Sequence, residues 1–330
     1  MKIIISSLLL CFCCQLCAAQ ADTLALKQVE KLAFDNKFDE AINVCNQLLA
    51  KDSSIGAYYD MRGSLYSAQN KFDQAGDDLN RALRLEPNNA NHYLHRSIVM
   101  YSTENPTMAI NDCNDALKYM TPRDTIKYRT LLVRGMAKEM KRDFAGAYED
   151  YKIVLEHDTT NCESLSNLGM VLSDLKREKE AVVYLEKVVR LCPDQPIGYS
   201  NLALLLQNSG EYKKSIEIID EGLKHLLPED VGGRGVMYNN RGYDELKLQK
   251  LQEALNDINE SLKVYPTNSY AFRNRALVYL AMKQKDKACE DLREALKQGF
   301  TLMYGDEVKE LMKANCPADS IPNDEDDMNR

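Results

Sequence analysis

The stretch Asn239–Asp257, NNRGYDELKLQKLQEALND, decides the fold of this chain. It places Arg241 directly before Gly242, Ala254 twelve residues after that Gly, and Asp257 three residues further on. The Ala-type position recurs, with gaps of 34, 34, 38, 34, 34, 39 and 34 residues, at Ala41, Ala75, Ala109, Ala147, Ala181, Ser215, Ala254 and Ala288. The Gly-type position twelve residues earlier recurs with the same period and the same two stretched steps at Gly63, Ser97, Gly135, Gly169, Ala203, Gly242 and Ala276. Two series that share one period indicate an array of structural repeats.

Each repeat has the pattern of two short helices. An apolar or aromatic residue lies four positions before each Gly-type residue, for example Tyr59, Tyr199 and Phe272. Pro87, Pro193 and Pro266 close three of the repeats, where a helix has to stop. Small residues at the Gly-type and Ala-type positions would let the two helices of a hairpin approach closely.

This pattern resembles the tetratricopeptide repeat, a 34-residue helix–turn–helix unit with the same Gly, aromatic, Ala and Pro arrangement. The resemblance implies an all-α fold, a right-handed α-solenoid of about eight repeats within residues 22–302, in an exported protein of bacterial type. The expected units are about 22–55, 56–89, 90–123, 128–161, 162–195, 196–229, 235–268 and 269–302. Residues 303–316 are expected to form a single amphipathic capping helix, and VGGRG at 231–235 an inter-repeat loop.

The two ends of the chain differ from the repeats. Residues 1–19 contain a Lys, then an uncharged apolar run, then small residues, which is the layout of a signal peptide. Cleavage after Ala19 or after Ala21 fits this layout, and the apolar run is too short to predict a transmembrane span in the mature chain. Residues 317–330 are acidic and predict a disordered tail. We therefore expect an exported protein, periplasmic or secreted. A lipid anchor is disfavoured because none of the early cysteines follows a small residue.

Charge narrows the class of partner. The chain of 330 residues has a net charge of −8 and no basic stripe, which argues against nucleic acid as a partner.

His92 and His95 are three residues apart on one helix, but no carboxylate or Cys has a matching spacing. A polar groove lining is therefore the better interpretation, and no metal is expected. No catalytic or cofactor-binding signature is present, so the sequence predicts neither an enzyme nor a cofactor. An unrecognised enzyme remains the remote alternative.

An Arg precedes five of the Gly-type positions, and an Asp follows each of those Arg residues by sixteen. In an antiparallel hairpin these two positions face each other, so we expect five structural ion pairs rather than a binding site. Leu168 and Leu202 replace the Arg in the fifth and sixth repeats, and the Asp is missing there too. The expected pairs are Arg62–Asp78, Arg96–Asp112, Arg134–Asp150, Arg241–Asp257 and Arg275–Asp291.

Six cysteines follow the signal peptide, and an exported protein can oxidise them. Cys162 and Cys192 are symmetric about the turn of the fifth hairpin, and Cys289 and Cys316 about the turn into the capping helix. These symmetries predict the disulfides Cys162–Cys192 and Cys289–Cys316. Cys45 and Cys113 occupy equivalent inward positions two repeats apart, which is too far for a bridge, so they are expected to be buried thiols.

The last candidate site follows from the resemblance. In tetratricopeptide arrays the position two before the Gly-type residue faces the concave groove, where an Asn can hydrogen-bond the backbone of a bound peptide. One helical turn beyond each Asn lies an apolar residue. Only Arg273 on this face suits a site for a C-terminal carboxylate, so that kind of groove is disfavoured. The predicted groove residues are Asn167, Asn201, Asn240, Asn274, Met170, Leu204, Tyr243 and Leu277.

The sequence therefore predicts a non-catalytic scaffold of the cell envelope or exterior, whose partner is another protein bound through an extended peptide or a helix. The alternative is a structural subunit of an envelope assembly that is held by its convex or end faces.

Overall fold

A computed structural model describes residues 20–121, 125–227 and 229–317, and the regular structure of these residues is entirely α-helical. The predicted signal peptide at 1–19 lies outside the described residues, as does the acidic tail beyond Pro317. Contacts divide the chain into two units, Met1–Leu175 and Lys176–Arg330.

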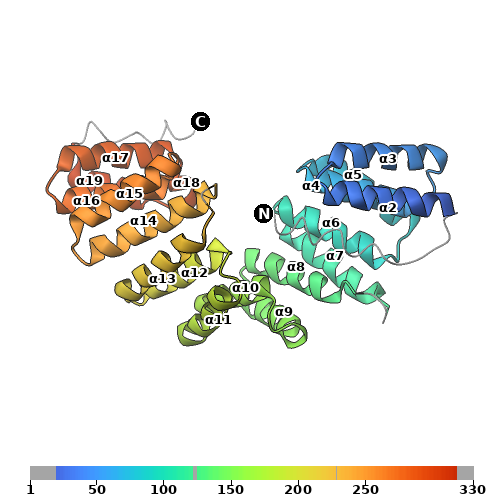
Figure 1. Ribbon diagram of the computed structural model, residues 1–330, viewed down its shortest axis with the longest axis horizontal. Helices are drawn as coiled ribbons and strands as arrows, with labels where there is room; N and C mark the ends of the chain where they lie inside the picture. Colours follow the sequence, from blue (N-terminus) through green and yellow to red (C-terminus); the bar gives the residue numbers. More distant parts are fainter. Residues whose placement is uncertain (1–19, 122–124, 228, 318–330) are drawn as a thin grey trace. The chain divides into compact units, whose positions relative to one another are not determined.

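The first unit contains four consecutive hairpins and one further helix (Figure 1). Within each hairpin the two helices pack on each other, and the second helix also packs on the first helix of the next repeat. The helices are α2 (Gln20–Phe34), α3 (Phe38–Lys51), α4 (Gly56–Ala68), α5 (Phe72–Leu85), α6 (Ala90–Ser102), α7 (Pro106–Tyr119), α8 (Lys127–Met140), α9 (Phe144–His157) and α10 (Cys162–Asp174).

The second unit begins with one helix, continues with three hairpins and ends in a cap. The first helices of its three hairpins also contact one another, α12 with α14 and α14 with α16. The helices are α11 (Glu178–Leu191), α12 (Pro196–Asn208), α13 (Tyr212–His225), α14 (Val231–Lys247), α15 (Leu251–Val264), α16 (Ser269–Ala281), α17 (Lys285–Lys297), α18 (Phe300–Tyr304) and α19 (Glu307–Asn315).

The turn inside each repeat depends on one left-handed residue. These residues have φ between 56° and 75° and recur with the same gaps as the two small-residue series: Asn36, Asn70, Glu104, Arg142, Lys176, Gly210, Gln249 and Lys283. At Asn70 the ends of the turn close as in a Schellman motif, with the Lys71 N–H donating to the Tyr66 carbonyl at 2.9 Å. Only one member of the series is Gly, so the residue types do not predict this turn.

The small residues of the opening stretch bring two helices into contact. A Cβ atom on Gly242 of α14 would lie 3.0 Å from the Ala254 carbonyl oxygen and 2.6 Å from Ile258 Cγ1 of α15. Such a separation leaves no room for a side chain at Gly242. Ala254 itself is completely buried. The spacing of twelve residues thus marks a place where the two helices of the hairpin are in close contact.

The prediction of an inter-repeat loop at 231–235 is wrong. These residues form the first turns of α14, whose N-terminus is capped by the Asp230 side chain accepting a hydrogen bond from Gly233 N–H at 3.0 Å. Gly235 lies inside the helix with Tyr265 Cβ 2.8 Å from the place of a Cβ atom. The glycines here serve helix packing rather than a flexible loop.

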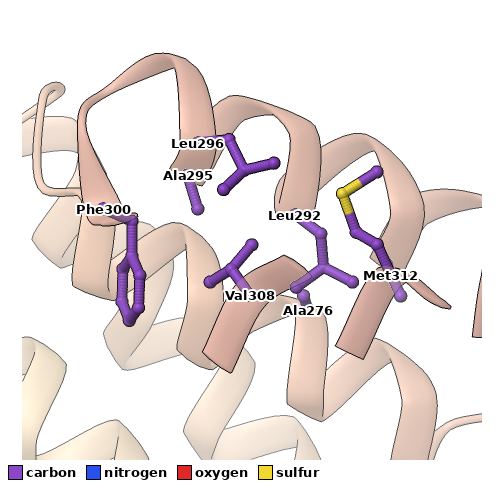
Figure 2. Close-up of a cluster of buried hydrophobic side chains, with 8 residues drawn as sticks. Ala276, Leu292, Ala295, Leu296, Phe300, Val308 and Met312 are labelled. Atoms are coloured by element: carbon purple, nitrogen blue, oxygen red, sulfur yellow. The ribbon is translucent and has the colours of Figure 1, made fainter. Parts of the chain in front are cut away.

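The single capping helix predicted at 303–316 is also wrong. Gly305, with φ of 83°, separates α18 from α19. Val308 and Met312 of α19 point into a cluster with Leu292 and Ala295 of α17 and with Phe300 (Figure 2). The cap therefore folds back over the apolar end of the last repeat, which a solenoid has to cover.

Candidate functional site

The five predicted Arg–Asp pairs all form, and each Arg also reaches the preceding repeat. In the second repeat Arg62 Nε donates to Asp78 Oδ2 at 2.7 Å and Nη2 donates to Asp78 Oδ1 at 2.8 Å, which closes the hairpin. The remaining nitrogen, Nη1, donates to Asn46 Oδ1 of α3 at 2.6 Å. We call this three-residue arrangement the Arg clamp. Its other members are Arg96–Asp112–Asn80, Arg134–Asp150–Asn114, Arg241–Asp257–Asp220 and Arg275–Asp291–Asn259.

In each Arg clamp the guanidinium group is mostly shielded from solvent and is bonded to residues of the fold. The side chain of Arg96 is 19% exposed and that of Asp112 is 3% exposed. Hydrogen bonding to the partner Asp raises the pKa values of Arg62, Arg96 and Arg134, so these groups stay charged. The Asn contact to the preceding repeat was not predicted, although an Asn lies sixteen residues before Arg62, Arg96 and Arg275. These Arg residues therefore join repeats and are not available to a ligand.

The four Asn residues that were predicted to line the groove lie in different environments. Asn274 is fully buried, where its amide donates to Asn239 Oδ1 at 2.9 Å and its oxygen accepts from Arg273 Nη1 at 2.6 Å. It cannot contact a peptide, so its assignment to the groove was wrong. Asn167 and Met170 are half-buried on α10 of the first unit, and Asn167 lies near the Tyr151 hydroxyl. Asn201 and Asn240 are half-buried in the second unit.

Arg273 is also committed within the fold. Its guanidinium lies 5.9 Å from the Tyr243 ring centroid and 5.5 Å from that of Tyr270, and it forms an ion pair with Glu307 of α19. Only 8% of Arg273 is exposed. A buried guanidinium that already has a carboxylate partner does not offer a site for a peptide terminus.

Several apolar side chains on three helices of the second unit are partly exposed. Leu204 (42% exposed), Tyr243 and Leu277 are the predicted row on α12, α14 and α16. Seven residues earlier on the same three helices, and so on the same side of each helix, is a second row that was not predicted. It consists of Ile197 (55% exposed), Val236 (37% exposed) and Tyr270. We call these six residues the apolar face.

Side-chain bonds fix the register of the three helices beneath the apolar face. Gln207 Nε2 of α12 donates to the Asn240 carbonyl of α14 at 3.0 Å, and the Asn239–Asn274 bond joins α14 to α16. These bonds hold α12 beside α14 and α14 beside α16. The two rows therefore lie on three adjacent helices.

The prediction that the two histidines line a groove is wrong, because both are buried. His95 Nδ1 lies 2.9 Å from Asp60 Oδ2, and His92 Nδ1 lies 3.0 Å from Asp60 Oδ1, although not in good hydrogen-bond geometry. His92 Nε2 lies 3.1 Å from Glu86 Oε2. Burial opposes the charge on His92, but Asp60 and Glu86 raise its pKa to about 9. These contacts join α4 to α6 inside the first unit. In the described residues, no three His, Cys, Asp or Glu side chains are arranged to hold a metal ion.

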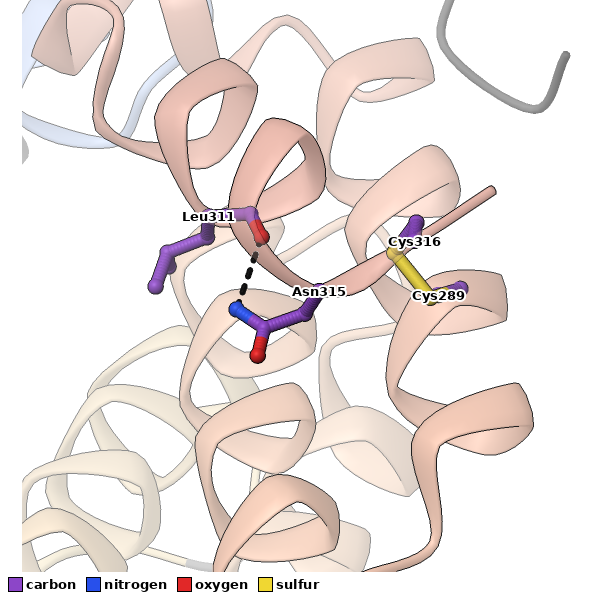
Figure 3. Close-up of a disulfide and its surroundings, with 4 residues drawn as sticks. All are labelled: Cys289, Leu311, Asn315 and Cys316. Carbon is purple, nitrogen blue, oxygen red and sulfur yellow. Dashed lines mark hydrogen bonds between the residues drawn. A yellow bond between two sulfur atoms is a disulfide. The ribbon is translucent and has the colours of Figure 1, made fainter. Parts of the chain in front are cut away.

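The cysteines of the cap are bonded to each other. Cys289 of α17 and Cys316 at the end of α19 form a disulfide with a Cα–Cα distance of 5.7 Å (Figure 3). Asn315 adds a hydrogen bond from its amide to the Leu311 carbonyl at 2.9 Å. Cys45 and Cys113 are buried free thiols, and burial raises the pKa of each to about 12. Cys162 lies in the first unit and Cys192 in the second, and their pairing stays a prediction.

Comparison with known proteins agrees with this architecture. Family models described as tetratricopeptide repeat match residues 56–89, 162–192 and 239–299. A tetratricopeptide repeat protein from Parabacteroides merdae superposes with a TM-score of 0.63, covering 79% of this chain and 98% of that one at 19% identity. The fold is a tetratricopeptide-repeat solenoid. The prediction of an all-α tetratricopeptide-repeat fold is thereby confirmed. Yeast Tom70 superposes with a TM-score of 0.61 at 16% identity, over 94% of this chain and 69% of its own. At such identities the likeness concerns the fold alone.

Curated relatives match this chain at low identity. Human protein O-mannosyl-transferase TMTC3 is 25% identical over 268 residues, which are 80% of this chain and 28% of that protein. Human mitochondrial import receptor subunit TOM34 is 28% identical over 212 residues, 62% of this chain and 65% of that protein. Human DnaJ homolog subfamily C member 7 is 27% identical over 172 residues, 48% of this chain and 34% of that protein. The chain thus spans from about a quarter to two thirds of the length of these relatives. Of the helices in the described part of the chain, none is long and apolar enough to cross a membrane.

Proposed function

We propose that this protein is a non-catalytic scaffold that binds a segment of another protein on the apolar face of α12, α14 and α16. The observation that carries the proposal is the pair of partly exposed rows on three stacked helices. Ile197 is 55% exposed and Leu204 is 42% exposed, and both belong to a group of six apolar side chains on adjacent helices. Covering such side chains with a partner removes apolar area from water and favours binding.

The polar residues beside the apolar face suit a peptide backbone. Asn201 and Asn240 lie one helical turn before Leu204 and Tyr243, and an Asn amide both donates and accepts hydrogen bonds. The partner segment is therefore an extended peptide or a helix with several apolar side chains. Lys247 at the end of α14, whose ammonium lies 5.0 Å from the Tyr243 ring centroid, adds one positive charge at this edge.

We also propose that the protein works in an exported, oxidising compartment, either the periplasm or the exterior. The Cys289–Cys316 disulfide supports this location, because disulfides persist in oxidising compartments and are rare in reducing ones. The signal-peptide layout of residues 1–19 supports it independently. Mass spectrometry of the protein recovered from its host should find a mature N-terminus at Gln20 or Asp22. An intact N-terminus would contradict the proposal of an exported protein.

Site-specific photocrosslinking in the native host tests the binding site. A photoreactive residue in place of Leu204 should crosslink a specific protein, whereas the same residue in place of Lys213, exposed on α13, should not. With the partner identified and purified, Leu204→Ser combined with Val236→Ser should raise Kd about tenfold or more, because two apolar side chains lose their burial.

The matched control is Ile153→Ser. Ile153 is 36% exposed, close to the value for Val236, but it lies on α9 of the first unit. We expect this variant to bind with the affinity of the wild type. Crosslinks from Lys213 alone, or equal affinities for both variants, would instead favour a structural subunit held by other surfaces.

A further inference from the structure

One core position of the repeats carries a carboxyl group. The position two residues after each Gly-type residue is buried throughout the array, with no more than 4% exposed. It is occupied by Leu65, Val99, Ala137, Val171, Leu205, Asp244 and Val278. Asp244 on α14 is the one polar residue of this series, and it is fully buried. The series therefore predicts Val or Leu where this chain has an acid.

The environment of Asp244 does not compensate a negative charge. The polar side chains that lower the pKa of Asp244 are Ser215 of α13 and Gln207 of α12. Gln207 Nε2 donates to the Asn240 carbonyl, and Ser215 Oγ donates to the Ala203 carbonyl at 3.3 Å. Neither carboxyl oxygen of Asp244 has a hydrogen-bond partner in good geometry among the described residues. An ionised carboxylate in this place would carry a large desolvation cost.

Ser215 and Asp244, which lie beside each other, both depart from the repeat pattern. Ser215 is the one hydroxyl residue in the Ala-type series, and its equivalents elsewhere are buried Ala residues. It belongs to repeat six, while Asp244 belongs to repeat seven. Two separate series thus change from apolar to polar at residues that lie beside each other. This coincidence points to a polar seam between the two repeats.

The charged groups around the seam have other partners. Helix α12 carries no charged residue. On α13, Lys214 pairs with Glu211, Glu221 with Lys224 and His225, and Asp220 with Arg241. Lys213 and Glu217 of α13 are exposed. On α14 itself the neighbouring Glu245 is half-buried, and burial followed by the charge of Asp257 raises its pKa to about 7. Lys247 of α14 is exposed, and no charged group of α14, α15 or α16 is among the causes that set the pKa of Asp244.

We propose that Asp244 is a pH-sensitive switch in the seam between the α12–α13 hairpin and α14. Protonated Asp244 is neutral and packs as the apolar residues of its series do. Ionised Asp244 places a negative charge in the same dry position and loosens the contact of repeat six with repeat seven.

The direction of the pH effect follows from burial. Burial raises the pKa of Asp244 from 3.8 to about 6 in the folded chain, against the smaller influence of Ser215 and Gln207. A carboxyl whose folded pKa lies above its unfolded pKa contributes its full stability below the unfolded value. That contribution is lost as the pH rises through the folded value. The seam is therefore tightest in mild acid and opens more readily above about pH 6.

Hydrogen exchange of the full chain tests this proposal on peptides from α12, α13 and α14. After correction for the intrinsic exchange rate, the opening constant of the wild type should rise about tenfold more between pH 5 and pH 8 than that of Asp244→Val. Asp244→Asn keeps the shape of the side chain without its charge and should also lose the extra pH dependence. Asp286→Asn, an exposed Asp on α17, is the control and should behave as the wild type.

A second measurement is independent of stability. Carbon-13 NMR of labelled aspartates should show one carboxyl that titrates near pH 6 and is absent from both Asp244 variants. Parallel pH profiles for wild type and both variants would overturn the proposal. So would the absence of any aspartate titrating above pH 5.

Discussion

Arg62 shows how a single side chain holds this array together. Two of its nitrogens bind Asp78 within the hairpin, and the third binds Asn46 of the repeat before. Its planar group offers donors in a fixed fork, which Lys could not reproduce. Because the same arrangement recurs in five repeats, one residue type closes the hairpin and also sets the contact to the preceding repeat.

Removing the acid of one clamp should therefore be costly. Asp78→Ala leaves Arg62 partly buried without its carboxylate, and we expect the free energy of unfolding to fall by about 3 kcal/mol. Asp77→Ala changes the adjacent, exposed Asp of α5 and should alter stability by less than about 0.5 kcal/mol. Urea denaturation followed by circular dichroism measures both. Equal effects of the two substitutions would mean that the clamp contributes no more than a surface charge.

At the residue scale the sequence was informative about pairs and less so about burial. The presence or absence of Arg and Asp together in a repeat predicted which residues would meet. Asn274 could not be distinguished from Asn240 in this way, because they have equivalent positions in the repeat. Asn274 is buried by Asn239 and Arg273, residues whose equivalents in other repeats differ. Its burial depends on neighbours in space that no periodic pattern contains.

The helices begin and end with the period of the repeats, except where local backbone geometry determines their bounds. The left-handed residue of each repeat turn recurs faithfully, yet it is Asn, Glu, Arg, Lys, Gln or Gly. Its conformation is imposed by the hairpin rather than by the residue type. The start of α14 was missed for the opposite reason, since three glycines suggested a loop while Asp230 capped a helix. Gly305 was overlooked inside an amphipathic pattern that continued on both sides of it.

The cap is the element most dependent on a covalent bond. Helix α19 has nine residues and is too short to be stable by itself. It is held by Val308 and Met312 in the apolar cluster, by the Arg273–Glu307 ion pair and by the Cys289–Cys316 disulfide. The bond closes a loop across 27 positions and contributes about 3–4 kcal/mol through the unfolded chain.

Cys316→Ser should consequently free the cap. We expect amide hydrogen exchange in α19 to accelerate by at least tenfold, while α14 and α15 keep their protection. Lys313→Ser changes an exposed residue of the same helix and should leave exchange unchanged. If α19 in the Cys316→Ser variant exchanges as slowly as in the wild type, packing alone holds the cap.

For the whole molecule, periodicity predicted the architecture because each repeat contacts mainly its neighbours. The same small set of contacts is repeated, so a few spacings specify most of the fold. The candidate site was predicted only in part. Leu204, Tyr243 and Leu277 were found from their place after the Asn series, but Ile197 and Val236 were not. Their importance comes from exposure on stacked helices, which is a property of the assembled structure.

The distribution of the Arg clamps also has a mechanical consequence. Clamps join repeats one to two, two to three, three to four, six to seven and seven to eight, whereas Leu168 and Leu202 take the Arg position at the two remaining junctions. When the chain is stretched from its ends in an optical trap, the α9–α10 and α11–α12 junctions should therefore yield at the lowest force. Arg241→Met removes the clamp between α13 and α14 and should add a further low-force extension, while Arg190→Met, on exposed surface of α11, should not. A solenoid built in this way behaves as a spring of unequal stiffness, in which tension is relieved near the middle of the array before the regions on either side begin to open.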